Sequence, residues 1–356
     1  MPRARFRLPL AGLLLMAGGL SLTSCKGGGQ QASGPPAGGP APAGPPATPP
    51  PGASSGQKVT IAIITNGISP FWDPMGVGME RAKAKYSCEA SWSGPQNAEI
   101  PDQKRKIEDA ISRKVDGLAV SAIDAAAITP TINQAVDAGI LTITFDSDAP
   151  KSKRLIYIGT NNYNAGHAAG EKAKELFPNG GKIIAFVGNR SAENARDREN
   201  GFKDAIKGTK IEVVDVREDN KDPSRARKNV EDAIQARKDI NGFLGLYSYN
   251  GPAIVDAVTA ANARDRYKII TFDAEPKTMQ ALQAGKIDFT VVQKPYEFGY
   301  DSVEFLYKAK TEGVDKAKQD MKVPANGIVD TGVELVTPKS YPDFKKRMDA
   351  LGVKSS

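Results

Sequence analysis

Short apolar segments alternate with amphipathic segments along most of this chain, from about residue 58 to residue 336. The apolar segments have the length of strands and end at polar or turn-forming residues, which is typical of buried strands in a parallel sheet. Between them, apolar residues recur at helical spacing, as at Ile107, Ala110 and Ile111. The pattern predicts strands at Val59–Asn66, Glu89–Ser93, Gly117–Ser121, Leu141–Asp146, Leu155–Gly159, Lys182–Gly188, Ile211–Val216, Gly242–Tyr247, Lys268–Asp273 and Asp288–Gln293.

This order of elements predicts the fold class. Strands separated by single helices pair in parallel through right-handed crossovers. The predicted strands are too many for one comfortable sheet of this type, and the pattern restarts near Asn161. We therefore expect an α/β protein with two similar lobes, each built on a doubly wound parallel sheet.

Polar side chains follow the predicted strands of both halves. The first strand runs into Ser69, Phe71 and Trp72, with Pro70 suited to the first turn of a helix because it has no amide hydrogen to leave unpaired. Later strands end in the segments FDSD (145–148), GNRSAEN (188–194), YSYN (247–250), FDAE (272–275) and VQKP (292–295). Ligands bind at the carboxyl ends of strands in open α/β sheets, so these residues predict a small-molecule cleft between the lobes.

The first 57 residues differ in composition from the rest of the chain. Residues 1–24 carry three arginines and then the apolar stretch LPLAGLLLMAGGL, which predicts a secretory signal peptide because the stretch is too short to span a membrane. Leu22–Cys25 (LTSC) resembles the bacterial lipobox, which implies cleavage before Cys25 and lipidation of its sulfur; an ordinary signal peptide with an incidental cysteine is the alternative. Residues 25–57 then form a spacer rich in Pro, Gly and Ala.

Charge and residue content exclude several classes of function. Loss of the three leader arginines lowers the formal net charge from +7 to about +4, and the remaining basic residues alternate with acidic ones, which argues against nucleic-acid binding. Lipidation of Cys25 would leave Cys88 as the one thiol, so no intramolecular disulfide could form. The single histidine, His167, and the lack of HExxH and P-loop motifs predict no enzyme, no metal site and no cofactor. A hydrolase with paired carboxylates is the alternative that the abundant aspartates leave open.

Four segments resemble, in this order and spacing, the ribose/galactose-type (type I) periplasmic solute-binding proteins of ABC importers. They are SPFW (69–72), TFDSDA (144–149), SAENARDRENGF (191–202) and TFDAEP followed by VVQKP (271–295). The resemblance covers roughly residues 58–336 and implies two lobes joined by a three-strand hinge near Thr160, Lys294 and Asp330. Residues 58–160 and 294–329 would form the N-terminal lobe, and residues 161–293 and 330–356 the C-terminal lobe.

The same resemblance implies a function. It predicts an exported, lipid-anchored monomer that closes over a monosaccharide-like ligand and delivers it to an ABC permease. A ligand sensor of the same fold, which docks on a membrane receptor or kinase, is the alternative. Residues beyond Val336 would be an extension, in which Phe344, Met348 and Leu351 are spaced as a short amphipathic helix.

The resemblance also assigns the site. Positions that contact the sugar in the ribose-binding branch fall here on Ser69, Phe71, Trp72, Asp146, Arg196, Asn250, Asp273 and Gln293. Ser147, which we include in the site, stands where that branch has an arginine, and the aromatic residue of its C-terminal lobe falls near Asp222. We therefore expect one cationic group and one stacking face to be missing, so the identity of the sugar does not carry over from ribose.

These residue types suit a sugar, which has apolar C–H faces and a rim of hydroxyl groups. Trp72 and Phe71 can cover a C–H face. Asp146 and Asp273 can accept hydrogen bonds from hydroxyl groups, and Arg196 can donate to oxygens and offset the charge of the aspartates.

Each position also has a structural interpretation. Phe71 could belong to the core, Asn250 and the two aspartates could cap the next element, and Gln293 could be an ordinary strand-end residue. Arg196 could pair with a neighbouring acidic residue on an exposed helix face. The functional interpretation therefore requires that these residues meet in a single groove.

Overall fold

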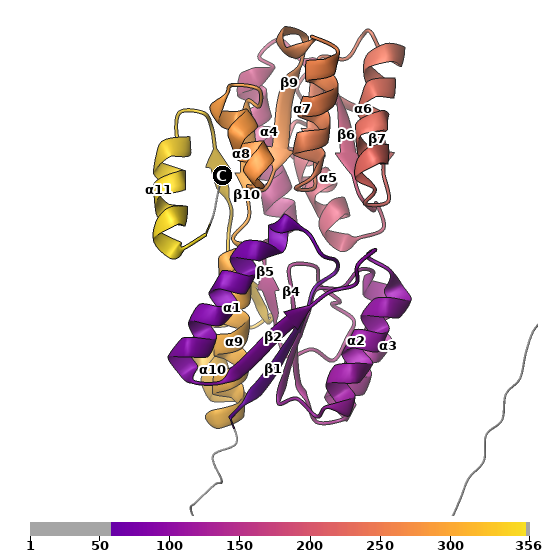
Figure 1. Cartoon of the computed structure of the whole chain (residues 1–356). Coiled ribbons are helices and arrows are strands. Elements are labelled where there is room, and N and C mark those ends of the chain that lie inside the picture. Colours follow the sequence, from indigo (N-terminus) through magenta and orange to yellow (C-terminus); the bar gives the residue numbers. More distant parts are fainter. Residues whose placement is uncertain (1–57, 354–356) are drawn as a thin grey trace, which may run out of the picture. The chain divides into compact units, whose positions relative to one another are not determined.

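The computed structural model describes residues 58–353. The predicted signal peptide (1–24), the lipidation site Cys25 and the spacer that follows it lie outside the described residues. The described residues form two lobes, each with a six-stranded sheet covered by helices (Figure 1). This confirms the predicted fold class, and each of the predicted strands is present.

The N-terminal lobe is built on a sheet with the strand order β11-β5-β4-β3-β1-β2, in which every pairing is parallel. Its strands are β1 (Thr60–Ile64), β2 (Glu89–Ser93), β3 (Gly117–Val120), β4 (Leu141–Phe145), β5 (Tyr157–Gly159) and β11 (Ile328–Asp330). Its helices are the 3-10 helix η1 (Pro70–Trp72), α1 (Asp73–Tyr86), α2 (Ile100–Ser112), α3 (Ala125–Asp137), α9 (Pro295–Thr311) and α10 (Val314–Asp320).

Side-chain alternation along β1 divides the core of this lobe into two layers. Ile61 and Ile63 pack with buried residues of α1 and α9 on one face of the sheet. Ala62 and Ile64 pack with buried residues of α2 and α3 on the other face. Because helices cover both faces, nearly every position of the strand is apolar, which explains the continuous apolar segment in the sequence.

The C-terminal lobe repeats this arrangement, with the strand order β12-β10-β9-β8-β6-β7. Its strands are β6 (Gly181–Val187), β7 (Ile211–Glu218), β8 (Gly242–Gly245), β9 (Lys268–Phe272), β10 (Phe289–Val292) and β12 (Glu334–Val336). Its helices are α4 (Asn162–Leu176), α5 (Glu193–Ala205), α6 (Pro223–Ala236), α7 (Asn250–Ala260), the 3-10 helix η2 (Arg264–Arg266), α8 (Pro276–Gln283) and α11 (Tyr341–Leu351). By position in the sheets, β4 corresponds to β9 and β5 to β10.

The sequence-based expectation does not include the edge strands β11 and β12, each of three residues. One pairing at the edge of the second sheet is antiparallel, that of β12 with β10. The reason is geometric. β11 runs parallel to its neighbour towards the second lobe, so the chain enters that lobe at the carboxyl edge of its sheet and must run against the other strands.

Within the described residues, the chain crosses between the lobes three times, between β5 and α4, between β10 and α9, and between β11 and β12. Three hydrogen bonds tie the first and third crossings together, one of them from Thr331 Oγ1 to the Gly159 carbonyl at 3.1 Å. The Thr331 amide donates to the Gly159 carbonyl at 2.8 Å, and the Asn161 amide donates to the Asp330 carboxylate at 2.9 Å. The first and third crossings therefore lie side by side.

Helices α4 and α5 contact each other closely enough to require glycine. A Cβ atom at Gly166 would lie 2.1 Å from the carbonyl oxygen of Arg198. A Cβ atom at Gly201 would lie 2.0 Å from the carbonyl oxygen of Tyr163. The backbone of α5 is thereby held directly against α4.

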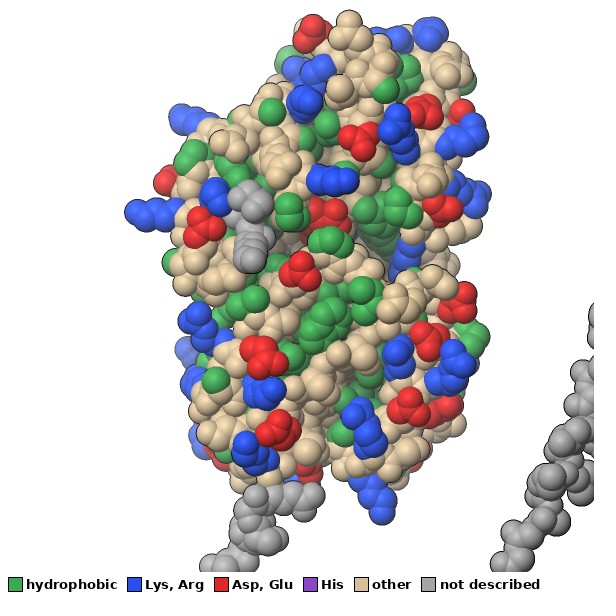
Figure 2. Space-filling model, in the orientation of Figure 1, with side chains coloured by type: hydrophobic (Ala, Val, Ile, Leu, Met, Phe, Trp, Pro, Cys, Tyr) green, Lys and Arg blue, Asp and Glu red, His purple; other side chains and the backbone are tan. Residues whose placement is uncertain are grey.

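Several further expectations concern the surface and the ends. Cys88 is buried, and the predicted C-terminal helix is present as α11, with Phe344 buried and Met348 against the core. Figure 2 shows basic and acidic side chains interleaved over the visible face, as predicted. No helix within residues 58–353 has both the length and the apolar character needed to cross a membrane.

Candidate ligand-binding cleft

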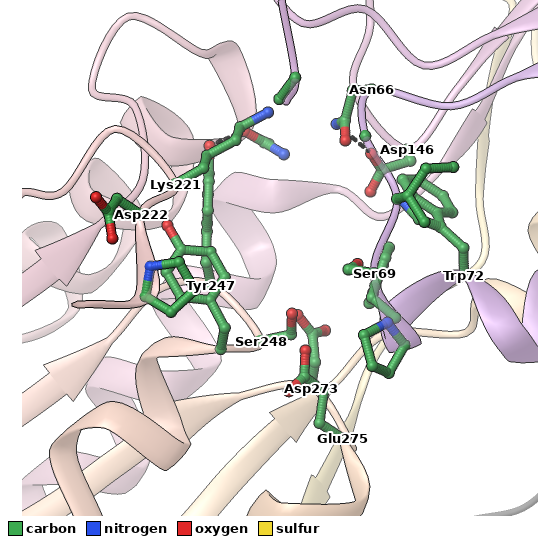
Figure 3. A pocket seen from close by; sticks show the side chains of 18 of the residues that line it. Asn66, Ser69, Trp72, Asp146, Lys221, Asp222, Tyr247, Ser248, Asp273 and Glu275 are labelled. Carbon is green, nitrogen blue, oxygen red and sulfur yellow. Dashed lines mark hydrogen bonds between the residues drawn. The ribbon is translucent and has the colours of Figure 1, made fainter. Parts of the chain in front are cut away.

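A cavity of about 710 Å³ lies between the lobes, where strands of both sheets end. Its volume is in the range of small-molecule sites. The N-terminal lobe contributes Asn66, Gly67, Ile68, Ser69, Pro70, Phe71, Trp72, Gln96, Asn97, Ala98 and Asp146. The C-terminal lobe contributes Asn194, Arg198, Asn220, Lys221, Asp222, Pro223, Tyr247, Ser248, Tyr249, Asp273, Glu275 and Gln293. Figure 3 shows polar and aromatic side chains projecting from both walls.

The structure brings most of the predicted site residues together in this cavity. Those that line it are Ser69, Phe71, Trp72, Asp146, Asp273 and Gln293. Ser147, Arg196 and Asn250 are not among the residues that line it.

The aromatic part of the N-terminal wall comes from the turn after β1. Ser69 has extended backbone and precedes Pro70, which begins η1 as expected. Trp72 is 2% exposed and packs edge-on against Phe71, at 4.7 Å between ring centroids, and against Phe145, at 5.7 Å. Trp72 therefore belongs both to the core and to the cleft wall, and its packing fixes the position of Phe71.

Asp146 ends β4 and supplies the carboxylate of the N-terminal wall. Its Oδ2 atom accepts hydrogen bonds from Ser121 Oγ at 2.7 Å and from Asn66 Nδ2 at 3.3 Å, the second of which is drawn in Figure 3. Burial raises the pKa of Asp146 to about 6. The other carboxylate oxygen has no hydrogen-bond partner among the described residues, so it is free to accept from a ligand hydroxyl.

Asp273 occupies the corresponding position after β9. Its Oδ1 atom accepts from Gln293 Nε2 at 2.9 Å, and burial raises the pKa of its carboxyl group. Both Asp146 and Asp273 have left-handed backbone, with φ of 56° and 71°, a conformation that aspartate tolerates better than most residues. Strain of this kind concentrates at binding sites, where it directs a side chain away from the strand.

Arg198, and not Arg196, is the arginine of the cleft. Its side chain donates from Nε to Asn162 Oδ1 at 2.9 Å and from Nη1 to the Leu246 carbonyl at 2.8 Å. Arg196 is exposed and donates to the Ser191 carbonyl within the loop before α5. Two residues along a helix differ by about 200° in direction, so only one of the two arginines can face the cleft.

Two buried polar atoms of the cleft have no hydrogen-bond partner among the described residues. They are Nη2 of Arg198 and Oε1 of Gln293. Buried polar groups are nearly always paired, and leaving one unpaired costs about 1–3 kcal/mol. One free donor and one free acceptor therefore point to a ligand that can both accept and donate hydrogen bonds.

Asn250 and Ser147 are hydrogen-bonded to segments that flank the cleft. Asn250 is buried behind the cleft, where its Oδ1 accepts from the Tyr247 amide at 2.9 Å and its Nδ2 donates to Asp219 at 3.0 Å. The Ser147 carbonyl accepts from the Ala122 amide at 2.9 Å, which ties the segment after β4 to the segment after β3. Both residues hold the neighbours of the cleft in place.

The expectation that the C-terminal wall lacks an aromatic face is wrong. Tyr247 and Tyr249 both line the cleft. Their hydroxyl groups are held by Asn194 Oδ1, at 3.1 Å, and by the Asp219 carboxylate, so the rings have fixed directions. Both tyrosines belong to the strand-end segment YSYN (247–250), from which the sequence analysis selected only Asn250.

Other residues of the cleft were missed individually. Asn194 and Glu275 belong to strand-end segments already noted for their polarity, whereas Asn66, Gln96 and Lys221 belong to loops without a distinctive pattern. Within residues 58–353, no group of three or more His, Cys, Asp or Glu side chains is placed to hold a metal ion. The cleft is therefore equipped with aromatic rings, carboxylates, amides and cations, which is a set suited to binding.

Comparison with known proteins identifies the family. A model of the periplasmic binding protein domain matches residues 59–313. The chain is 24% identical over 279 residues to the ribose import binding protein of Escherichia coli, which covers 78% of this chain and 91% of that protein. It is 23% identical over 291 residues to a xylose/arabinose-binding protein of Sulfolobus acidocaldarius, which covers 78% and 70%.

Solved structures agree with this result. An ABC transporter solute-binding protein from Burkholderia graminis, in complex with D-arabinose, has a TM-score of 0.75 and 29% identity over 81% of this chain and 98% of that one. These relatives are binding proteins, in agreement with the prediction that the chain is not an enzyme. Because the family model covers well over half of the sequence, this chain belongs to the periplasmic binding protein family.

Proposed function

We propose that this protein captures a monosaccharide-like ligand in the cleft between its lobes and delivers it to an ABC permease. The observation that carries the proposal is the set of unfilled hydrogen-bonding groups around the cleft. Among residues 58–353, Arg198 has a donor, Gln293 an acceptor and Asp146 a carboxylate oxygen that find no hydrogen-bond partner. Sugar hydroxyl groups both donate and accept, so a single polyhydroxyl ligand could satisfy all three.

The aromatic residues support the same ligand class. Phe71 and Trp72 on one wall and Tyr247 on the other offer rigid apolar area to the C–H faces of a sugar ring. Relatives named for ribose, for xylose and arabinose, and for D-arabinose in a solved complex point in the same direction.

Hinge closure is the proposed mechanism. The ligand would contact Asp146 and Trp72 from one lobe and Arg198 and Asp273 from the other, with the three crossings as the flexible segments. A ligand that gains contacts from both lobes only in the closed form shifts the population towards that form by its difference in affinity. The closed form would then be the one that the permease recognises.

Export and anchoring complete the proposal. The leader in residues 1–24 and the LTSC segment ending at Cys25 support a protein that is exported and then lipid-anchored outside the cytoplasm. Replacing Cys25 by Ser should move the protein from the membrane fraction to the soluble exported fraction. Continued membrane association of that variant would contradict lipid anchoring.

A ligand sensor of the same fold is the second candidate. One similar structure, with a TM-score of 0.72 and 27% identity, is the complex of XylFII with LytSN. A binding protein of this fold can therefore be held by a second protein. Cross-linking in intact cells distinguishes the candidates, since transport predicts permease subunits as the captured partner and sensing predicts a receptor or kinase.

The test of binding is a thermal-shift screen followed by calorimetry. The panel contains D-ribose, D-allose, D-xylose, D- and L-arabinose, D-glucose, D-galactose, D-fructose and myo-inositol. We expect one compound to raise the unfolding temperature clearly above the others, because a ligand that binds only the folded state stabilises it. No shift with any sugar or polyol would refute the proposed function.

A further inference from the structure

Lys221 lines the cleft from the loop between β7 and α6. Its side chain is half-buried and extends from the C-terminal wall into the cavity (Figure 3). Its ammonium group has no hydrogen bond or ion pair with any described residue. An unpaired cation at the wall of a binding cleft therefore needs an explanation.

The loop that carries Lys221 is held in one conformation. Asn220 and Lys221 both have left-handed backbone, with φ of 56° and 63°, which is unfavourable for residues other than glycine. The buried carboxylate of Asp219 accepts from the Lys221 amide at 2.8 Å, and it also accepts from the Tyr249 hydroxyl and the Asn250 amide group. These bonds maintain the strained turn, so the position of the lysine side chain at the cleft is part of the fold.

The surroundings leave this cation without enough compensation. Burial lowers the pKa of Lys221, while Asp146 across the cleft and Asp219 beneath the loop oppose that effect without contacting the amine. A partly desolvated ammonium group gains most from an oxygen acceptor placed directly against it. In the cleft, that acceptor would have to come from the ligand.

The charge of the cleft indicates whether the oxygen that accepts from Lys221 belongs to a neutral ligand or to an acidic one. Among the lining residues, the acidic side chains are Asp146, Asp222, Asp273 and Glu275, whereas the cationic ones are Arg198 and Lys221. Negative charge is therefore in excess, and a sugar acid would bring a further negative charge close to these carboxylates. A hydroxyl oxygen of a neutral ligand avoids this cost and still accepts from the ammonium.

We infer that Lys221 is a specificity-determining residue of the cleft, and that it donates a hydrogen bond to one hydroxyl oxygen of a neutral polyhydroxyl ligand. This inference rests on the proposed function and narrows its substrate class. It implies that the cleft discriminates against sugars that lack a hydroxyl on the side facing Lys221. It also implies discrimination against the acid forms of the same sugars.

The test compares wild-type protein with Lys221→Met, which keeps the length of the side chain and removes its donors. Calorimetry uses the sugar of the panel that binds most tightly, its monodeoxy analogues and its acid form (D-ribonate for D-ribose, D-xylonate for D-xylose, D-galacturonate for D-galactose). Lys228→Met, on the exposed face of α6, is the matched control.

We expect Lys221→Met to weaken binding of the neutral sugar by about 10- to 150-fold, the range for a hydrogen bond from a charged donor. For the one monodeoxy analogue that lacks the contacted hydroxyl, the two proteins should bind equally. The acid should bind wild-type protein at least about tenfold more weakly than the parent sugar. Without ligand, the unfolding temperature of Lys221→Met should be equal to or above that of wild type, because the substitution removes an unpaired charge.

Three outcomes would overturn the inference. One is a dissociation constant for Lys221→Met within twofold of wild type, and another is an equal loss for every monodeoxy analogue. The third is tighter binding of the acid than of the neutral sugar. In each case wild-type protein still binds a sugar, so the proposed function survives. If wild-type protein binds nothing in the panel, the proposed function fails and this inference fails with it.

Discussion

Replacing Asp273 by Asn tests the chemistry of the cleft with little disturbance of its shape. Asp273 has a φ of 71°, a region that asparagine also tolerates, so the backbone after β9 should be unchanged. The amide oxygen of asparagine can still accept the 2.9 Å hydrogen bond from Gln293. The substitution therefore removes the negative charge and turns one acceptor oxygen into a donor. Alanine is a poorer choice, because it would add about 1–2 kcal/mol of backbone strain at this position.

The expected effect follows from the exchange of these groups. A hydrogen bond from a ligand hydroxyl to a carboxylate is worth about 1.5–3 kcal/mol, which corresponds to a loss of about 10- to 150-fold in affinity. Stability without ligand should respond differently. Burial raises the pKa of Asp273, so above its ordinary pKa of about 3.9 the ionised carboxylate destabilises the folded state. The neutral amide should leave the unfolding temperature unchanged or higher.

Calorimetry with the tightest sugar of the panel and thermal unfolding without ligand measure the two effects. Asp256→Asn, at an exposed position of α7, is the matched control and should change neither. The reasoning is refuted if Asp273→Asn binds within twofold of wild type. It is also refuted if the unfolding temperature without ligand falls by more than about 3 °C, roughly 1 kcal/mol for a domain of this size, because Asp273 would then be a structural residue.

Four further predictions concern other residues of the cleft. Arg198→Met should weaken sugar binding by about 100-fold or more, with Arg198→Lys intermediate, whereas Arg196→Met should bind like wild type in calorimetry; a loss confined to Arg196→Met would reverse our placement of the two arginines. Since burial raises the pKa of Asp146 to about 6 and its ionised form accepts from the ligand, affinity should fall about tenfold from pH 7 to pH 5, and a flat profile would contradict this role. The pKa of Asp146 is higher in the folded state than in the unfolded state. Without ligand, the free energy of unfolding should therefore decrease as the pH rises from about 4 to about 6, where Asp146 loses its proton in the folded protein. Ligand should change the fluorescence of wild type and of Trp92→Phe but not of Trp72→Phe, and a signal that persists in Trp72→Phe would place the reporter elsewhere.

The strands and their meeting point could be predicted because parallel strands between two helical layers leave long apolar segments in the sequence. Polar residues such as Asp146 and Asp273 directly after those segments then had to gather at one edge of each sheet. The short strands β11 and β12 could not be predicted, since their pairing depends on where the hinge delivers the chain.

The differences between the predicted site residues and the residues that line the cleft have a common physical origin. Motif spacing orders residues along the chain, but it does not fix the rotation of a helix, so Arg196 and Arg198 could not be distinguished. The direction of Tyr247 depends on a hydrogen bond to Asn194, which lies 53 positions away in sequence. Lys221 faces the cleft because Asp219 stabilises an unfavourable backbone turn, and such a turn leaves no pattern in the neighbouring residues.

The glycine contact between α4 and α5 means that the position of the Arg198 side chain depends on residues outside the cleft. A larger side chain at Gly166 would clash with the main chain of Arg198. Removing that clash requires the whole of α5 to shift, and the guanidinium group of Arg198 would shift with it. A substitution at Gly166 could thus weaken ligand binding although every residue that lines the cleft is unchanged. When variants of this protein are screened for altered ligand binding, positions 166 and 201 belong in the comparison alongside the residues of the cleft.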